Sequence, residues 1–363
     1  MATCSTSPIE ARPRAGVTGE PLPLVAAGGV QPQQPPEGSL VEVADGIFWA
    51  RMPLPFALDH VNVWLLRDGQ GFTLIDTGMA DARTRGLWER IFAEQLGGLP
   101  ITRLICTHHH PDHMGLSSWF HARFGVRMTT TIGEWTHGRL GWLESGEDFL
   151  THASDHFVRF GLRDERLRLA IAEGNNYRKY IDPIPLDFIR ISDGDRLSIG
   201  GREWHVLTFS GHSPEHVCLW CPEADVLIAG DQVLPKISPT IGVWSNEPEA
   251  NPLGGFFASL NRLMTLSDDA LVLPSHGLPF TGLRQRCKAL KAHHDDRLKH
   301  TLDCCGDPSS GADVMERLFP RTLSGHDLLF AVAETLSHLN SLIAEGCIEY
   351  SAGEKQNITY SAK

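Results

Sequence analysis

The sequence predicts an α/β protein with more than one domain, and three observations carry this prediction. Between residues 40 and 282, short apolar runs rich in β-branched residues alternate with stretches of helical periodicity. One apolar run, residues 101–106, leads directly into a cluster of histidines and an aspartate. After residue 283 the pattern changes to helices followed by a short hairpin. A chain of 363 residues has room for two or three domains.

Composition narrows the classes of function. The chain carries 44 acidic and 32 basic residues, a formal net charge of −12, which disfavours nucleic acid and anionic membranes as partners. No apolar run approaches the roughly 18–20 residues of a membrane-spanning helix. The start of the chain lacks the basic-then-apolar order of a secretory signal, and the eight cysteines are scattered like reduced thiols. We therefore expect a cytoplasmic protein with no membrane partner.

The N-terminal part of the chain divides into a tail and a strand-rich region. Residues 1–36 are rich in Pro, Gly and Gln, and they are predicted to form a disordered or loosely packed tail. Residues 37–282 are predicted to form the catalytic domain. A helix is expected over residues 82–96 and another near Leu116. The strands expected before the histidine cluster are residues 40–43, 46–50, 61–66, 72–78 and 101–106.

Residues 133–181 differ from their surroundings, because their pattern is helical with several aromatic residues and mixed charge. They separate the histidine cluster from the next strands, so we expect a helical insertion that caps a site. A further helix is predicted over residues 252–266. The strands expected after the insertion are residues 188–191, 196–199, 203–207, 217–220, 225–229 and 270–274.

The last segment, residues 283–363, is predicted to form a winged-helix-like C-terminal domain. Apolar residues recur at helical spacing over residues 283–302 and 329–343, with a short helix between them. Alternating residues around Gly353 then predict a hairpin. Helices followed by a hairpin is the element order of a winged helix. His293 and His294 are expected on a solvated helix face.

The charge of this segment argues against nucleic acid. It contains ten Lys and Arg against eleven Asp and Glu, and residues 325–345 contain no Lys or Arg. A winged helix would contact a groove with this helix, and phosphate binding requires clustered cations. We therefore expect the segment to serve as a packing surface, with a homo-oligomer formed through it as one outcome.

The strongest motif follows the strand at residues 101–106. His108, His110, Asp112 and His113 place four metal-binding side chains within six residues. Imidazoles at i and i+2 can reach one cation, and the Asp-His pair just after them can reach a second cation. His109 is expected to point away from them if the loop is extended. The motif predicts a metal site at a strand terminus.

Three more candidate ligands share one setting. His212, Asp231 and His276 each follow an apolar strand and lie beside a glycine. Glycine lets the backbone turn sharply and approach a metal closely. A single histidine after a strand is more often a hydrogen-bonded surface residue, but the repeated context predicts that all three join the cluster in one site.

These motifs resemble those of the metallo-β-lactamase superfamily over roughly residues 40–282, and the turn Asp76-Thr77-Gly78 matches as well. The resemblance implies an αββα sandwich with a dinuclear site at one edge. The chain departs from the family at Met114-Gly115-Leu116, where many members have a small residue and two glycines. The implied ligands are His108, His110 and His212 for one metal, Asp112, His113 and His276 for the other, and Asp231 as the bridge.

The ligand set also narrows the branch of this superfamily. The β-lactamases proper generally lack a bridging aspartate, so Asp231 favours the glyoxalase II-like branch. Diiron oxygen-reducing members usually place an acid where this chain has His110. The helical tail resembles the winged helix that follows this fold in one group of these hydrolases.

The chemistry of such a site favours hydrolysis. Two divalent ions lower the pKa of a shared water from about 15.7 to near 7, and they stabilise the oxyanion that forms on an attacked carbonyl. We expect a metal-bridging hydroxide that hydrolyses a small-molecule acyl substrate: a thioester, ester or lactone. The alternatives are a phosphodiesterase or ribonuclease, a β-lactamase, and a non-catalytic metal-binding scaffold. Zinc is the expected metal, with iron and manganese as alternatives.

Individual residues receive specific roles. Asp112 is the expected catalytic residue, because it would bind metal and orient the hydroxide. Asp76 is expected to hold a histidine ligand by a hydrogen bond, with simple turn capping as the alternative. Ordinary structural roles are the alternative for each substrate contact. The candidate substrate contacts are His60, Tyr177, Tyr180 and Lys236.

Overall fold

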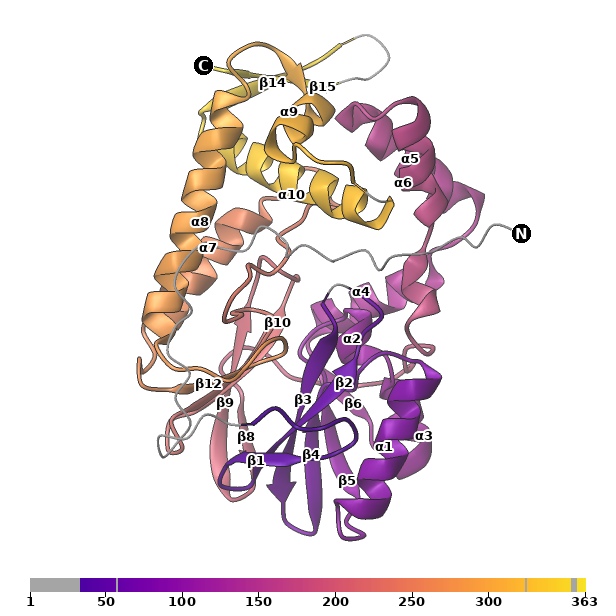
Figure 1. Ribbon diagram of the computed structural model, residues 1–363, viewed down its shortest axis with the longest axis vertical. Coiled ribbons are helices and arrows are strands. Elements are labelled where there is room, and N and C mark those ends of the chain that lie inside the picture. Colours follow the sequence, from indigo (N-terminus) through magenta and orange to yellow (C-terminus); the bar gives the residue numbers. More distant parts are fainter. Residues whose placement is uncertain (1–32, 57, 324, 354–357) are drawn as a thin grey trace, which may run out of the picture.

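A computed structural model describes residues 33–56, 58–323, 325–353 and 358–363 of the chain. Most of the predicted tail over residues 1–36 lies outside these described residues. The described chain forms a lower part built around two β-sheets and an upper part that is mainly helical (Figure 1).

The first sheet has seven strands in the order in which they occur along the chain. Strands β1 to β4 are antiparallel, and β4 to β7 are parallel. The parallel half directs the carboxyl end of β5 toward one edge of the sheet. The strands are β1 (Val41–Ala44), β2 (Ile47–Pro53), β3 (His60–Asp68), β4 (Gly71–Ile75), β5 (Ile101–Ile105), β6 (Met128–Thr130) and β7 (Ile189–Arg190).

The second sheet has five strands in the order β12-β11-β10-β9-β8. Its pairs are antiparallel except for β11 and β12, which run parallel. Two neighbouring strands of this sheet therefore also end at one edge. The strands are β8 (Arg196–Ile199), β9 (Arg202–Phe209), β10 (His216–Cys221), β11 (Val226–Gly230) and β12 (Leu271–Pro274).

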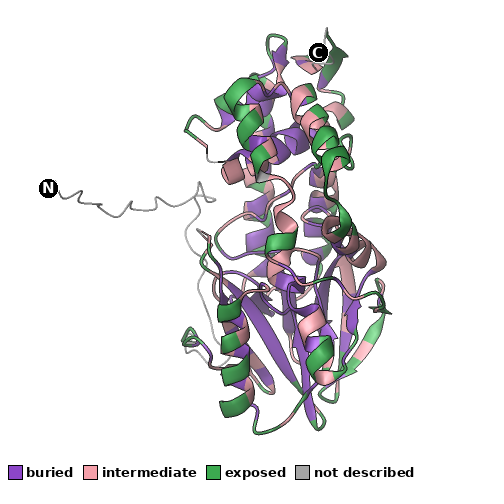
Figure 2. Ribbon diagram, turned by 90° about the vertical axis from the view of Figure 1, so that its right-hand side faces the viewer, coloured by how far each residue is buried: buried purple, intermediate pink, exposed green. Residues whose placement is uncertain are grey.

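The sheets pack face to face and each has helices on its outer side. Trp49 and Trp64 of the first sheet share one buried core with Trp204 of the second. Helices α1 (Ala82–Glu94) and α3 (Ser117–Phe124) cover the first sheet through Trp88 and Phe120. Helix α7 (Pro252–Leu263) packs on the second sheet through Phe256 and Leu260. Figure 2 shows the buried strands between helices whose outer faces are exposed. The predicted αββα sandwich is confirmed.

Helices occupy the stretch where the insertion is predicted. They are α4 (Ile132–Leu143), α5 (Glu147–Phe160), α6 (Asp164–Glu173) and the 3₁₀ helix η1 (Asn176–Lys179). Phe160 and Leu162 pack with Val332 and Leu336 in a separate apolar cluster. Helices α5 and α6 therefore lie beside α10 (Gly325–Ala344) in the upper part of the molecule (Figure 1). We call residues 132–179 the cap.

The C-terminal segment has the element order helix, strand, helix, helix, hairpin. Its three strands form a sheet in the order β13-β15-β14. This order agrees with the expected helices and hairpin, while the likeness to a winged helix stays a prediction. The elements are α8 (Leu283–Asp303), β13 (Ser309–Ser310), α9 (Gly311–Leu318), α10, β14 (Ile348–Ala352) and β15 (Ile358–Ala362).

His294 corrects one expectation, because it does not lie on a solvated helix face. Helix α8 packs between α7 and α10, and His294 is only 2% exposed. Its Nε2 lies 2.9 Å from Ser238 Oγ, and its Nδ1 lies 3.3 Å from His338 Nε2 on α10. The periodicity of α8 alone did not reveal that two further helices cover this face.

Two further observations concern the described residues as a whole. None of their helices combines the length and the apolar character that crossing a bilayer requires. Their seven cysteines are all free thiols, and six of them are buried. The scattered cysteines in this part of the chain therefore form no disulfide.

Candidate metal centre

The edge where strands of both sheets end collects all seven side chains predicted as ligands. His108 and His110 lie in the loop after β5, and Asp112 and His113 lie in the short helix α2 (Pro111–Met114) that follows. The second sheet supplies the other three. They are His212 between β9 and β10, Asp231 directly after β11, and His276 directly after β12.

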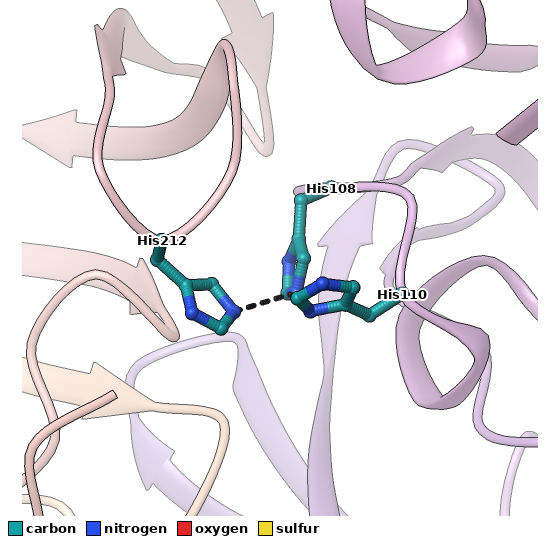
Figure 3. Close-up of side chains that lie close together, drawn as sticks. All are labelled: His108, His110 and His212. Carbon is teal, nitrogen blue, oxygen red and sulfur yellow. Dashed lines mark hydrogen bonds between the residues drawn. The ribbon is translucent and has the colours of Figure 1, made fainter. Parts of the chain in front are cut away.

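Three imidazoles form the first group. His108 Nε2 lies 2.9 Å from His110 Nδ1 and 3.2 Å from His212 Nε2, and the three rings point toward one another (Figure 3). Two neutral imidazole nitrogens at this distance repel each other through their lone pairs unless a proton or a cation lies between them. The convergence of three such nitrogens is the arrangement of a cation site.

Asp112, His113 and His276 form the second group. Asp112 Oδ2 lies 3.5 Å from His113 Nε2 and 3.4 Å from His276 Nε2. The ligand atoms of each group lie within 4.8 Å of one another. Each group thus offers three atoms to one ion.

Asp231 lies between the two groups. Its Oδ2 is 3.5 Å from His212 Nε2 in the first group. Its Oδ1 is 3.3 Å from His276 Nε2 and 3.7 Å from His113 Nε2 in the second. One carboxylate therefore presents one oxygen to each group, which is the geometry that a bridging ligand needs.

The outer nitrogens of four of these histidines are all hydrogen-bonded to oxygen. Carboxylate and carbonyl oxygens only accept, so the facing Nδ1 carries the proton and the inward Nε2 keeps its lone pair. Thr107 Oγ1 also accepts, because its own proton goes to Asp76. The four pairs are His108 with Thr107 Oγ1 (3.0 Å), His113 with Asp76 Oδ2 (2.8 Å), His212 with the Thr240 carbonyl (2.8 Å) and His276 with the His60 carbonyl (2.7 Å).

The residues present fit two divalent cations. His113 Nε2 and Asp231 Oδ1 are buried without a hydrogen-bond partner. Buried polar atoms in folded proteins are normally paired, and a cation between the groups would satisfy both atoms. Imidazole with carboxylate is a donor set that suits zinc and also iron or manganese.

The charges around the centre favour positive charge inside it. Burial by itself would lower the pKa of His113, but the carboxylates of Asp112, Asp231 and Asp76 outweigh burial and raise it. Burial would raise the pKa of Asp231, but His276 and His113 outweigh it and hold the pKa well below its usual range. The carboxylates therefore stay ionised and attract a cation, whether a proton or a metal.

Asp76 combines the two roles considered for it from the sequence. Its backbone has φ 62°, a left-handed conformation that aspartate tolerates better than most residues. Oδ1 accepts from the Thr107 backbone N–H (2.7 Å), which fixes the turn after β5. Oδ2 accepts from Thr107 Oγ1 (2.8 Å) and from His113 Nδ1 (2.8 Å). One buried carboxylate thus fixes the loop and orients a histidine of the second group.

The candidate substrate contacts lie in different settings. The His60 ring is held between Asp59 Oδ1 and the Gly277 N–H, so it fixes the loop that carries His276. Lys236 is exposed on the loop after β11. The role of all four residues as substrate contacts stays a prediction. The other two are Tyr177, whose hydroxyl donates to the His109 carbonyl (2.5 Å), and Tyr180, whose ring packs edge-on against Phe56 (5.4 Å).

His216 is a functional residue that the sequence did not reveal. Its Nε2 accepts from the Asp231 backbone N–H (3.1 Å), and its ring stacks on His108. Burial and the nearby His212 lower the pKa of His216 to about 3, so the ring is neutral. Gly230 has φ 53°, and a Cβ there would lie 2.4 Å from the His216 ring, so only glycine fits. A histidine at the start of an apolar strand carries no local signal for this role.

Glu134 is a second residue that the sequence did not reveal. It lies on α4 of the cap and is completely buried. Burial would raise the pKa of Glu134, but hydrogen bonds from His109, Ser213 and Glu215 outweigh it and lower the pKa to about 2. His109 turns toward this carboxylate while its neighbours His108 and His110 face each other, as the extended-loop argument expects.

Family profiles identify the chain. The profile of the Metallo-beta-lactamase superfamily matches residues 57–276, which is more than half of the chain. The profile of the Metallo-beta-lactamase-like C-terminal domain matches residues 298–363. The chain therefore belongs to the metallo-β-lactamase superfamily, and it is a metallo-hydrolase of that superfamily.

Individual proteins agree with this assignment. A β-lactamase domain protein from Burkholderia ambifaria is 41% identical, with a TM-score of 0.82 over 91% of this chain and 95% of that one. The probable metallo-hydrolase YqjP of Bacillus subtilis (strain 168) is 27% identical over 82% of this chain and 92% of its own length. The human acyl-coenzyme A thioesterase MBLAC2 is 25% identical over 64% of this chain and 79% of its own length.

Proposed function

We propose that the protein is a dinuclear metal-dependent hydrolase of acyl thioesters, with small esters and lactones as the neighbouring substrate classes. The observation that carries this proposal is the position of Asp231, which presents one oxygen to each of two groups of ligand atoms. We propose zinc as the metal, held by His108, His110 and His212 on one side and by Asp112, His113 and His276 on the other.

Two divalent ions held there would supply a nucleophile at neutral pH and stabilise negative charge on the scissile carbonyl. The chain supplies the proton acceptor. The Asp112 side chain is 19% exposed, whereas that of Asp231 is 9% exposed, so Asp112 is the carboxylate more open to an entering water. Asp112 orients that water and takes its proton as the C–S bond breaks, and the proton then passes to the leaving thiolate.

The thioester class is supported by the likeness to the human acyl-coenzyme A thioesterase. The burial of the ligands also suits acyl transfer to water, because His108 and His113 are fully buried and bulk water is excluded from their side. Lys236 on the exposed loop after β11 is proposed to contact an anionic part of the substrate.

A phosphodiesterase is the competing function, and the described C-terminal residues do not favour it. Helix α10 contains no Lys or Arg and is largely buried, so it presents no cationic face to a phosphate backbone.

A substrate panel tests the proposal. The purified protein, loaded with zinc, manganese or iron, is assayed on acyl thioesters, lactones, phosphodiesters and β-lactams at equal concentration. We expect the highest kcat/KM on a thioester and none above background after chelation. A higher kcat/KM on phosphodiesters or β-lactams than on every acyl substrate would contradict the proposed substrate class.

A further inference from the structure

The cap holds the residue between two of the metal ligands by all of its polar backbone groups. His109 lies between His108 and His110, and its backbone N–H donates to Glu134 Oε2 (2.9 Å). The His109 ring donates through Nδ1 to the same oxygen (2.7 Å). Its carbonyl accepts from the Tyr177 hydroxyl (2.5 Å). Glu134 lies on α4 and Tyr177 on η1, so both ends of the cap contact this one residue.

The second oxygen of the same carboxylate reaches the other ligand loop. Glu134 Oε1 accepts from Ser213 Oγ (2.6 Å) and from the Glu215 backbone N–H (2.8 Å). These residues directly follow His212. A single buried side chain therefore connects the loop of His108 and His110 with the loop of His212, and these three residues make up the first group of ligands.

The start of α4 is fixed to the same loop. Thr131 Oγ1 donates to the Glu215 carbonyl (3.0 Å), and the Gly133 N–H donates to Glu215 Oε2 (2.9 Å). A Cβ on Gly133 would lie 2.9 Å from the Glu215 carboxylate carbon, so a larger residue would displace this contact. These bonds hold α4 where Glu134 can reach both ligand loops.

The chemistry of the contact requires a carboxylate. Four donors converge on Glu134: the N–H and the ring of His109, the Ser213 hydroxyl and the Glu215 N–H. A carboxylate only accepts, so it satisfies all four, and these bonds offset the cost of burying its charge. A glutamine of the same shape would turn its NH₂ group toward donors on one side.

We propose that the cap sets the geometry of the His108, His110 and His212 group through Glu134 and Tyr177, which are positioning residues. This inference rests on the proposed dinuclear function. It gives the cap a task besides covering the site: the cap fixes the spacing of two ligand loops that belong to different sheets. The second group has no such contact with Glu134, so the effect of these residues is selective for the first group.

Metal titration of the full chain tests the inference without any assay of turnover. Zn²⁺ and Co²⁺ affinities are measured against a competing chromophoric chelator for wild type, Glu134→Gln and Tyr177→Phe. Glu144→Gln at the end of α4 and Tyr350→Phe on β14 are the matched controls, because both side chains are exposed. The Co²⁺ absorption bands of His110→Ala and Asp112→Ala identify which group each ion occupies.

We expect Glu134→Gln to weaken one ion by about 10- to 100-fold, the range seen when hydrogen-bond partners of ligands are removed. Its Co²⁺ spectrum should resemble that of His110→Ala and not that of Asp112→Ala. Tyr177→Phe should weaken the same ion by a smaller factor, about 5-fold for one neutral hydrogen bond. Both controls should retain wild-type affinities for both ions.

Two results would overturn the inference. One is a wild-type affinity for both ions in Glu134→Gln and Tyr177→Phe, and the other is an equal weakening of both ions, which indicates general destabilisation. Tyr177→Phe removes a single hydroxyl and keeps the test decisive if Glu134→Gln does not fold. Failure of the proposed function has a different signature, because wild type and controls would then bind fewer than two ions themselves.

Discussion

Asp76 and His113 are joined by a 2.8 Å hydrogen bond between Oδ2 and Nδ1, although 37 positions separate them in the chain. The same Oδ2 accepts from Thr107 Oγ1, which in turn accepts from His108 Nδ1. One carboxylate therefore sets the tautomer of a histidine in each of the two ligand groups: His113 directly and His108 through a hydroxyl. Asp76 lies at the end of β4, which is the strand next to β5, so the sheet itself brings these groups together.

Replacing Asp76 with asparagine should weaken metal binding without unfolding the loop. Asparagine tolerates the left-handed backbone, and its oxygen can still accept from the Thr107 N–H. Its NH₂ group would face His113 Nδ1, so the ring would move its proton to Nε2 and lose the inward lone pair. We expect a loss of about 10- to 100-fold in metal affinity, measured by titration with Asp45→Asn as an exposed control. Unchanged affinity would show that Asp76 only caps the turn.

Replacing the two carboxylates should separate the roles assigned to them. Asp231→Ala removes the bridge and should weaken both ions, whereas Asp112→Ala should weaken the second ion and remove the proton acceptor. We expect kcat to fall at least about 100-fold in each variant, the scale for loss of a general base or of charge stabilisation. Metal content and turnover are measured on the same preparations. Near-normal turnover in either variant would contradict its assigned role.

Metal removal should lower stability in proportion to the number of sites filled. Elemental analysis of protein purified without chelator is expected to give about two ions per chain. Each ion adds about 4 kcal/mol to the free energy of unfolding when free metal is about 1,000 times its Kd. Chelation should therefore lower Tm, and adding zinc should restore it. Fewer than one equivalent, with no gain on adding zinc, manganese or iron, would exclude the dinuclear site.

His294 should make the fold less stable at acidic pH. Burial lowers its pKa to about 2, with smaller contributions from the nearby His338, His293 and Arg297. An unfolded histidine titrates near about 6.5, so below that pH the unfolded chain binds more protons than the folded one. Stability therefore falls as the pH falls, by about 2 kcal/mol between pH 7 and pH 5 for this residue.

Urea unfolding of the metal-free protein at several pH values measures this effect. The matched variant is His294→Gln, which keeps hydrogen-bonding groups toward Ser238 and His338 but does not titrate. The variant should be less stable than wild type at pH 7, and the difference should narrow toward pH 5. A constant difference across this range would mean that His294 does not titrate between the folded and unfolded states as described.

Lys236 is expected to act on substrate binding and not on the metals. It is exposed five residues beyond Asp231, on the loop that leaves the centre. If it contacts an anionic part of the substrate equally in the ground and transition states, Lys236→Ala raises KM and leaves kcat nearly unchanged. Kinetics on an anionic and a neutral thioester are compared, with metal content as the control. Identical KM values for both substrates in variant and wild type would return Lys236 to the surface.

The sequence by itself determined the αββα fold and indicated the seven side chains that the structure brings together. Both signals are local. Strands and helices follow from the period of apolar residues, and His212, Asp231 and His276 each stand just after an apolar strand beside a glycine. Parallel neighbours end at the same edge of a sheet, so ligands at strand ends converge once the sheets form. Few long-range details are needed to predict such a site.

Only the tertiary structure decided the roles of residues whose partners are distant in the chain. Glu134 meets Ser213 across 79 positions, and His294 meets His338 across 44. Neither residue stands in a local pattern that distinguishes it from an ordinary helix residue. A buried polar side chain is defined by the donors and acceptors that other segments bring to it, and those positions exist only after packing. The ligands were therefore legible in the sequence, while the groups that orient them were not.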